Sequence, residues 1–348
     1  MTRGTERPCA HDGAARVAIV GNLNMDLLLG PLAHPPTFGH ETFVAEQSLR
    51  PAGQAFQTAM ALAALGDSPC LVGDVGDDPF GAGIAAALRA GGVSVAGVHT
   101  CPGRSTGLSV ALFDERRDRA FVTHLGHLEE LDDTAVMDRW GHIAGCRFLL
   151  LCGYFCLPGM RASGGEALRR ARADGMTTVL DTGWDPDGWT ASTREEIRVL
   201  LRQIDIFMPN QDEAHALTGL TDPAAAAAEL ASWGPATTIV KLGPDGALGR
   251  RHGAYERVAA LPTAVADTVG AGDAFNAGAL YALARGRPLA TVLRVGVAVA
   301  SHAIARREPR YATVEHLRNV LGYLDDLDAP RPEGDKVIPS SIMGGDER

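Results

Sequence analysis

Short apolar runs alternate with segments of helical apolar spacing through most of the chain. From Phe148 onward the order is strand, helix, strand, with strands expected at 148–151 and 177–180 and helical segments near 164–174 and 192–203. Short runs that are apolar throughout are typical of buried parallel strands. The pattern predicts an α/β fold, in which a doubly wound, mostly parallel sheet is flanked by helices. An active site is then expected at the carboxyl ends of the strands.

Two other regions have a different pattern. Between about 27 and 50, Pro and Gly interrupt short mixed segments such as 41–45, which we expect to be short strands outside the main core. In region 105–126 two apolar runs flank a charged turn and predict a β-hairpin. Three arginines of this turn, Arg116, Arg117 and Arg119, are expected to be solvated, although any of them could instead reach a substrate phosphate. Together these strands would form a small separate sheet.

The strongest chemical signal is the stretch 267–276, which reads Asp-Thr-Val-Gly-Ala-Gly-Asp-Ala-Phe-Asn. Gly270, Ala271 and Gly272 allow a tight turn with uncovered N–H groups, and the apolar spacing that follows predicts a helix. Free amides at the positive end of a helix dipole form an anion site. Asp273 would repel a phosphate there, but it suits a base that takes a proton from a hydroxyl. The alternative is that Asp273 only caps the helix.

The order Asp-Thr-x-Gly-Ala-Gly-Asp in 267–273 resembles the C-terminal signature of the ribokinase-like (PfkB) carbohydrate kinases. The resemblance covers 16–325, predicted as the kinase domain, with the small sheet as its lid. Residues 1–14 and 329–348, rich in Pro, Gly and charge, are predicted to be disordered tails. The resemblance implies phosphoryl transfer from ATP to an alcohol group, with Asp273 as base and the amides of the glycine turn stabilising the transferring group.

An apolar run at 17–20 ends in Gly and polar residues and predicts a buried strand that leads to a site. Asn24 and Asp26 lie two residues apart, so they would share a face in extended chain. The alternative is a simple turn. The resemblance assigns both side chains to the hydroxyl groups of a sugar.

The resemblance also assigns Gly53 and Gln57 to acceptor binding, but the signature in 51–59 is imperfect. Ala52 replaces the first of two glycines, and Gln57 stands where the family has asparagine. Alanine restricts the backbone, and glutamine carries its amide about one methylene further into the pocket. The identity of the acceptor is therefore less transferable than the chemistry.

Two further segments are expected to bind the nucleotide. Asn210 and Glu213 have capping-box spacing, whereas the resemblance assigns this Asn-x-x-Glu motif to ordering Mg²⁺, through water, and the nucleotide phosphates. The loop that begins at Lys241 resembles the family's nucleotide loop, which implies that Lys241, Gly243 and Gly246 approach ATP. It is not a Walker A loop, because no G-x-x-x-x-G-K-[ST] occurs.

Family members often bind K⁺ with backbone near Asp267 and with a Gly-Ala pair after the helix expected at 289–305. Here the corresponding stretch, 306–309, reads Arg-Arg-Glu-Pro. The sequence therefore leaves both a potassium-dependent and a potassium-independent enzyme open.

Composition narrows the class of protein. The net charge of −10 argues against a nucleic-acid or anionic membrane surface. No apolar run approaches the roughly 18 residues that span a bilayer, and the N-terminus lacks a signal-peptide core, so we expect a cytoplasmic protein. The six cysteines include no C-x-x-C pair and the histidines no H-x-x-x-H, so neither a zinc nor a disulfide framework is expected.

The leading hypothesis is an ATP-dependent kinase that phosphorylates a primary hydroxyl of a sugar or sugar derivative. One alternative is a nucleoside kinase, which uses the same chemistry on a ribose that carries a base. Another is a non-catalytic relative that binds sugar or a protein partner. A lid with an exposed sheet edge would also pair with a second copy and give a homodimer.

Overall fold

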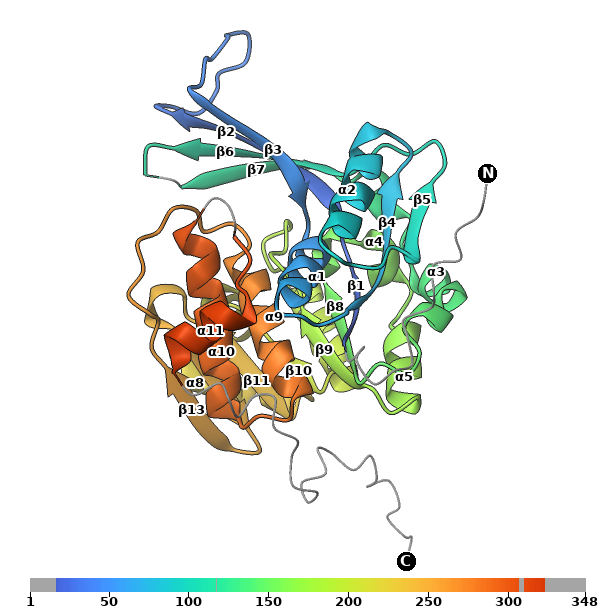
Figure 1. Ribbon diagram of the computed structural model, residues 1–348, viewed down its shortest axis with the longest axis vertical. Coiled ribbons are helices and arrows are strands. Elements are labelled where there is room, and N and C mark those ends of the chain that lie inside the picture. Colours follow the sequence, from blue (N-terminus) through green and yellow to red (C-terminus); the bar gives the residue numbers. More distant parts are fainter. Residues whose placement is uncertain (1–16, 117, 307–309, 323–348) are drawn as a thin grey trace, which may run out of the picture.

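The computed structural model describes residues 17–116, 118–306 and 310–322. Within them the chain forms a nine-stranded sheet and a four-stranded sheet that projects from one end of the molecule (Figure 1). The predicted tails, 1–14 and 329–348, lie outside the described residues. No helix in the described ranges has both the length and the apolar character needed to cross a lipid bilayer.

The strands of the large sheet lie in the order β13-β12-β11-β10-β9-β8-β1-β4-β5. Neighbours from β11 to β5 pair in parallel, and β12 and β13 add an antiparallel edge. The nine strands are β1 (Val17–Gly21), β4 (Cys70–Gly76), β5 (Gly97–Cys101), β8 (Phe148–Cys152), β9 (Thr177–Asp181), β10 (Ile206–Phe207), β11 (Thr237–Lys241), β12 (Ala247–Arg251) and β13 (Ala254–Val258). The mostly parallel sheet expected from the apolar runs is confirmed.

Strand β1 shows why helices cover both faces of this sheet. Its side chains alternate between two apolar cores, with Val17 and Ile19 in one and Ala18 and Val20 in the other. Successive side chains of a strand point to opposite faces, so a strand that is apolar throughout needs a cover on each side.

The helices divide accordingly. Helices α1, α2, α9, α10 and α11 contribute to the first core, and α3 to α8 contribute to the second. Their bounds are α1 (Gln54–Ala64), α2 (Pro79–Ala90), α3 (Asp133–Asp138), α4 (Pro158–Ala162), α5 (Glu166–Ala173), α6 (Ala191–Leu200), α7 (Gln211–Thr218), α8 (Pro223–Ser232), α9 (Ala271–Ala284), α10 (Leu289–Ala305) and α11 (Val314–Leu321). This is the doubly wound α/β architecture that the sequence predicts.

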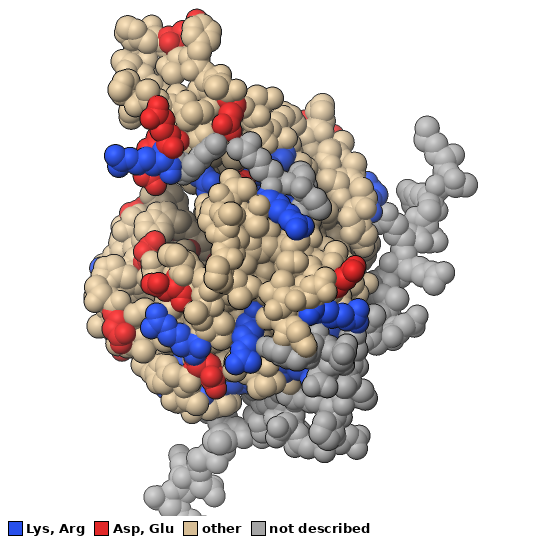
Figure 2. All heavy atoms as spheres, turned by 60° about the vertical axis from the view of Figure 1, so that its left-hand side comes forward, with Lys and Arg blue, Asp and Glu red and all other residues tan. Residues whose placement is uncertain are grey.

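The smaller sheet, called the lid below, has the strand order β3-β2-β6-β7. Its strands are β2 (Asn24–Leu32), β3 (Glu46–Ala52), β6 (Leu108–Asp114) and β7 (Arg119–His124). Strands β6 and β7 pair antiparallel, as expected for a hairpin. The lid projects above the body as a separate lobe, and the surface is hollowed between them (Figure 2).

One predicted lid strand is wrong. The segment 41–45 has no strand structure, and Phe43 within it is exposed. The pairing of β2 with β3 ends at the Gly30–Glu46 pair, so the residues before Glu46 have no neighbouring strand to bond with. Because a strand depends on such a partner, this part of the chain is an exposed connection.

Candidate active site

The centre of the candidate site is the turn before α9. Gly270 adopts a left-handed conformation with φ of 78°, and α9 begins at the next residue. A Cβ at Gly270 would lie 3.2 Å from Arg310 Nη2, and a Cβ at Gly272 would lie 3.5 Å from Lys241 Nζ. Two cationic side chains therefore flank the turn, which favours an anion at this helix terminus.

The amides of this turn are not all free. The Ala271 N–H donates to Thr268 O at 3.2 Å, and the Ala274 N–H donates to Gly270 O at 2.9 Å. The Ala271 amide thus closes the turn, so it is a poorer anion donor than its position in the sequence suggests. The predicted role of the turn in holding a phosphoryl group therefore depends more on Gly270 and Gly272.

Asp273 lies in the first turn of α9 and is 9% exposed. The pKa of its carboxyl is raised to about 7, chiefly by burial and then by the neighbouring charge of Asp181, although Lys241 and Arg310 act in the opposite direction. A carboxyl poised near neutrality can accept a proton from a hydroxyl and release it again at the pH of a cell. This electrostatic setting favours a base at Asp273 over a simple helix cap, since the cap position is taken by Gly270.

The pH dependence of turnover follows from this pKa. A base must be ionised, so we expect kcat/KM to fall about tenfold per pH unit below pH 7 and to level off above it. Steady-state rates between pH 5.5 and 8.5 test this. The Glu213 carboxyl also has a pKa raised to about 7, chiefly by burial, so Glu213→Gln is the control and should keep the acid limb. A flat profile would be evidence against Asp273 as the base.

The two predicted sugar-binding side chains of β2 are held together. Asn24 Nδ2 donates to Asp26 Oδ1 at 3.0 Å, and Asn22 Nδ2 donates to Asn24 Oδ1 at 3.0 Å. Burial raises the pKa of Asp26 to about 6, although Arg50, Asn24 and Arg310 oppose this shift. Asn24 and Asp26 are therefore fixed as strand residues, and the alternative of a simple turn is wrong.

The other two predicted acceptor residues, Gly53 and Gln57, lie at the start of α1. Gly53 has φ of 100°, and a Cβ there would lie 2.3 Å from Asn22 O and 2.8 Å from Asn24 Oδ1, so only glycine fits. Gln57 is buried, and its Oε1 accepts a hydrogen bond of 2.7 Å from the Tyr311 hydroxyl. Ala52 needs no special backbone, because it ends β3 as the partner of Asn24. The departure at Ala52 therefore leaves the fold of this segment intact.

Asn210 and Glu213 form the capping box that their spacing predicts. Glu213 N–H donates to Asn210 Oδ1, and Asn210 N–H donates to Glu213 Oε2, each at 2.8 Å. One Glu213 oxygen is therefore used in the helix cap. The buried carboxyl faces the charges of Asp181 and Lys241, which places it beside the rest of the site. A contact with Mg²⁺ through water uses the other oxygen and stays a prediction.

Lys241 ends β11 and points toward the glycine turn. Its Nζ lies 2.6 Å from Asp181 Oδ2 and 3.4 Å from Asn276 Oδ1. In the loop that follows, a Cβ at Gly246 would lie 2.0 Å from Val258 O, so this glycine is needed for packing against β13. Gly243 has open space around it. The predicted approach of this loop to ATP is compatible with the position of Lys241 beside Gly272.

The comparison with protein families decides the identity. The family model described as "pfkB family carbohydrate kinase" matches residues 14–316. The chain belongs to the pfkB family of carbohydrate kinases. The family resemblance carried by the Asp-Thr-x-Gly-Ala-Gly-Asp motif is thereby confirmed, and the chain is a carbohydrate kinase.

Individual relatives agree with this family. An uncharacterized sugar kinase of Archaeoglobus fulgidus is 29% identical over 249 residues, which cover 71% of this chain and 95% of the relative. A ribokinase of Lactococcus lactis is 24% identical over 315 residues, which cover 90% and 98% of the two chains. Among solved structures, a putative ribokinase II of E. coli in complex with ATP and Mg²⁺ has a TM-score of 0.74 at 21% identity, covering 88% of this chain and 99% of that one. The last likeness shows a shared fold.

Sequence reasoning missed two residues that lie in the candidate site, Asp181 and Arg310. Asp181 ends β9 and is buried, and it accepts hydrogen bonds from Lys241, Asn276 and Gln54. Although burial alone would raise its pKa, the contacts led by Lys241 lower it, so Asp181 is ionised. A signal existed, since Asp181 is the charged residue at the carboxyl end of an expected strand. No comparable signal marked Arg310, which lies in an irregular segment before α11.

The expectation that all the turn arginines are solvated is wrong for Arg119. Arg116 is exposed as expected, and Arg117 lies outside the described residues. The Arg119 side chain is 17% exposed rather than solvated, and its Nη2 lies 2.8 Å from Asp267 Oδ1. The charged turn therefore reaches the first residue of the signature motif. The arginine side chain and Asp267 also border a cleft of about 980 Å³ that lies between the lid and residues 265–268.

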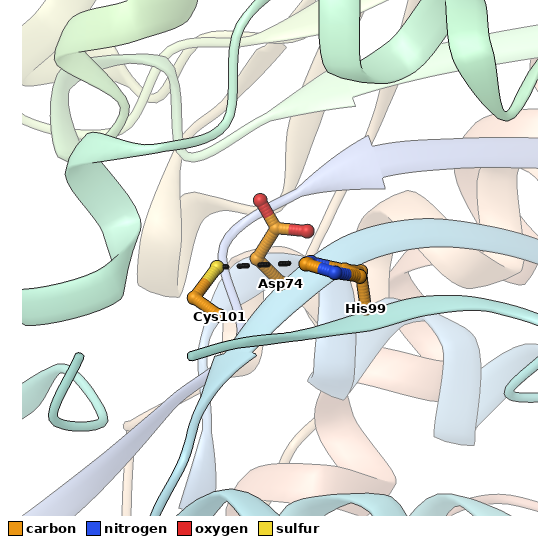
Figure 3. A group of neighbouring side chains, drawn as sticks. All are labelled: Asp74, His99 and Cys101. Carbon is orange, nitrogen blue, oxygen red and sulfur yellow. Dashed lines mark hydrogen bonds between the residues drawn. The ribbon is translucent and has the colours of Figure 1, made fainter. Parts of the chain in front are cut away.

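A separate group of candidate metal ligands lies on β4 and β5. Potential ligand atoms of Asp74, His99 and Cys101 lie within 4.8 Å of one another (Figure 3). Asp74 Oδ1 is already bound by Arg139 Nη1 at 2.6 Å, and the pKa of the Cys101 thiol is raised to about 11, chiefly by burial. A metal ion would have to displace the arginine and deprotonate the thiol, so these contacts favour a structural role.

The cysteines need one correction. Cys101, Cys146, Cys152 and Cys156 are free thiols, as expected. Cys70 is disulfide-bonded, which the spacing of the cysteines did not indicate.

Proposed function

We propose that this carbohydrate kinase transfers the γ-phosphoryl group of ATP to a primary hydroxyl of a sugar or sugar derivative, with Asp273 as the base. The observation that carries the proposal is the meeting of a near-neutral carboxyl with an anion-binding turn at one helix terminus. Two cations, Lys241 and Arg310, flank that turn. Phosphoryl transfer depends on positioning and on charge stabilisation, and these groups supply both.

In the proposed reaction, Asp273 takes the proton of the acceptor hydroxyl while the hydroxyl oxygen attacks the γ-phosphorus. The bond from that phosphorus to the β,γ-bridging oxygen breaks, and ADP leaves. The transferring group carries negative charge, which the Gly270 to Gly272 turn and the nearby Lys241 would stabilise. The low exposure of Asp273 excludes most water and so disfavours transfer to water in place of the alcohol.

The acceptor would be held by Asn24, Asp26, Gly53 and Gln57. Asp26 is a natural partner for two adjacent hydroxyl groups, because an ionised carboxylate offers several acceptor positions. Asp26 lies close enough to Asp273 for its negative charge to raise the pKa of the Asp273 carboxyl. Gln57 can present its NH₂ group, since its Oε1 is engaged by Tyr311.

ATP and Mg²⁺ fit the residues on the other side of the turn. The E. coli neighbour that shares the fold is a complex with both. Asn210, Lys241, Gly243 and Gly246 would line the nucleotide, and Glu213 would hold Mg²⁺ through water. When bound, Mg²⁺ would neutralise charge on the phosphate oxygens.

A thermal-shift panel tests the acceptor class. We expect at least one sugar or sugar derivative to raise the melting temperature by several degrees at saturating concentration, because ligands that bind only the folded state stabilise it. Nucleosides are the comparison set, and Asp26→Asn is the control that should lose most of the shift. A shift with nucleosides alone would establish the nucleoside-kinase alternative instead.

The lid is also a candidate surface for a second copy of the chain. β7 is an edge strand of the lid, and its Phe121 and Val122 are 58% and 65% exposed. Exposed apolar edge strands commonly pair with another strand. We therefore expect light scattering to give a mass near twice 36.5 kDa, and Phe121→Asp to give a monomer. A monomeric wild type at micromolar concentration would contradict the pairing.

A further inference from the structure

We infer that three arginines, Arg50, Arg119 and Arg310, occupy the position of a monovalent cation at the loop 267–270, so that this kinase works without potassium. The inference rests on the proposed function for its kinetic test only. Its binding test needs no turnover, so the inference and the proposed function can fail separately.

The first oxygen group of the loop is the Asp267 carboxylate, and each of its two oxygens contacts an arginine. Arg50 Nη2 lies 2.8 Å from Asp267 Oδ2, and Arg119 Nη2 lies 2.8 Å from Asp267 Oδ1. The Val269 N–H also donates to Asp267 Oδ1 at 2.9 Å. The carboxylate is 12% exposed, and these contacts hold its pKa below the usual range even though burial alone would raise it.

The second oxygen group, the Val269 carbonyl, accepts a hydrogen bond from Arg310 Nη2. Arg310 is buried, at 4% exposure, and the same Nη2 lies beside Gly270. Its positive charge reaches both Asp26 and Asp273, the two carboxyls expected to face the acceptor. The buried Arg310 guanidinium therefore lies where the loop 267–270 leads to the two carboxyls expected to face the acceptor.

A potassium ion needs several oxygen atoms that are free to replace its hydration shell. At this loop the Asp267 carboxylate and the Val269 carbonyl already bond to guanidinium groups. The ion would have to break those bonds and then sit beside like charges, which repel it. Residues 307–309, where the family resemblance places the rest of a potassium site, lie outside the described residues, so the inference depends on Asp267 and Val269.

Two of the three arginines belong to the lid, so they move with it, whereas a bound ion would not be attached to the lid. Arg50 lies on β3 and Arg119 on β7, whereas Asp267 begins the loop that leads to α9. A change in the lid position therefore breaks or restores the charge balance at the loop directly. Arg310 comes from the body, so it fixes the carbonyl side of the loop whatever the lid does.

The first test compares potassium with choline at equal ionic strength on the wild-type protein. Differential scanning fluorimetry in 0 to 100 mM KCl should show the same melting temperature as in choline chloride. With the acceptor found in the panel, kcat should agree within about twofold between the two salts. A potassium-specific rise in melting temperature, or a several-fold activation by KCl over choline chloride, would overturn the inference.

The second test returns the Val269 carbonyl to solvent with Arg310→Ser. We expect this variant to gain a potassium-specific rise in melting temperature and to lose activity in choline that KCl partly restores. Arg194→Ser, on the exposed face of α6, is the matched control and should behave as the wild type. A folded Arg310→Ser protein that is indifferent to potassium in both measurements would count against the inference, and if the variant does not fold the wild-type comparison still decides.

Discussion

Replacing Asp273 with Asn is expected to lower kcat about 10³-fold, within the range that general bases contribute. Asn keeps the size and the acceptor oxygen of the side chain, but it cannot take the proton of the acceptor hydroxyl. Because Asp273 is buried and lies beside Lys241 and Arg310, no solvent base replaces it easily. Steady-state kinetics with ATP and the identified acceptor measure the effect.

The same variant should leave substrate binding nearly unchanged, so that KM for the acceptor moves by less than about threefold. Asp138→Asn is the matched control, since Asp138 is exposed at the end of α3 and takes no part in the site. It should keep wild-type kcat. If Asp273→Asn also retained kcat within a few fold, Asp273 would be a helix-terminal residue and the base would lie elsewhere.

Lys241→Met is expected to lower the free energy of unfolding by about 3–5 kcal/mol. Lys241 Nζ lies 2.6 Å from Asp181 Oδ2, and the two side chains are only 11% and 2% exposed. Because Asp181 is buried, removing the lysine leaves an uncompensated carboxylate in the interior. Urea unfolding at pH 7.5 measures the loss. The size of the effect comes mainly from the charge that remains rather than from the ion pair itself.

Two further variants test that explanation. The double variant Asp181→Asn with Lys241→Met should recover much of the lost stability, because no buried charge is left alone. Arg161→Met breaks a half-exposed pair with Glu196 and should cost only about 1 kcal/mol. A loss below about 1 kcal/mol for Lys241→Met, or a double variant less stable than the single one, would show that Asp181 does not depend on Lys241.

The sequence was informative wherever local pattern and tertiary structure agree. β1 is apolar throughout because both of its faces are covered, so its run at 17–20 indicated a central parallel strand. The Gly270 turn was equally readable, because its backbone conformation requires glycine and the helix follows at once. These elements are set by residues that are neighbours along the chain.

The features that the sequence did not predict depend on contacts between segments far apart in the chain. Arg310 reaches a carbonyl 41 residues earlier in the chain, and nothing in its own segment indicates that contact. The segment 41–45 has a mixed apolar and polar sequence but lacks a partner strand, because the register of β2 with β3 ends at Glu46. The role of Arg119 likewise depends on Asp267, which lies 148 positions away. Such contacts follow from topology, which a single sequence specifies only indirectly.

The most direct test of the account is the transfer of radiolabelled γ-phosphate from ATP to a library of sugars, sugar derivatives and nucleosides. Wild type and Asp273→Asn are assayed in parallel, with Asp138→Asn as the control. The account predicts label on at least one alcohol with the wild type and the control, and only background with Asp273→Asn. Labelling of no alcohol at all, or equal labelling by the wild type and Asp273→Asn, would contradict it.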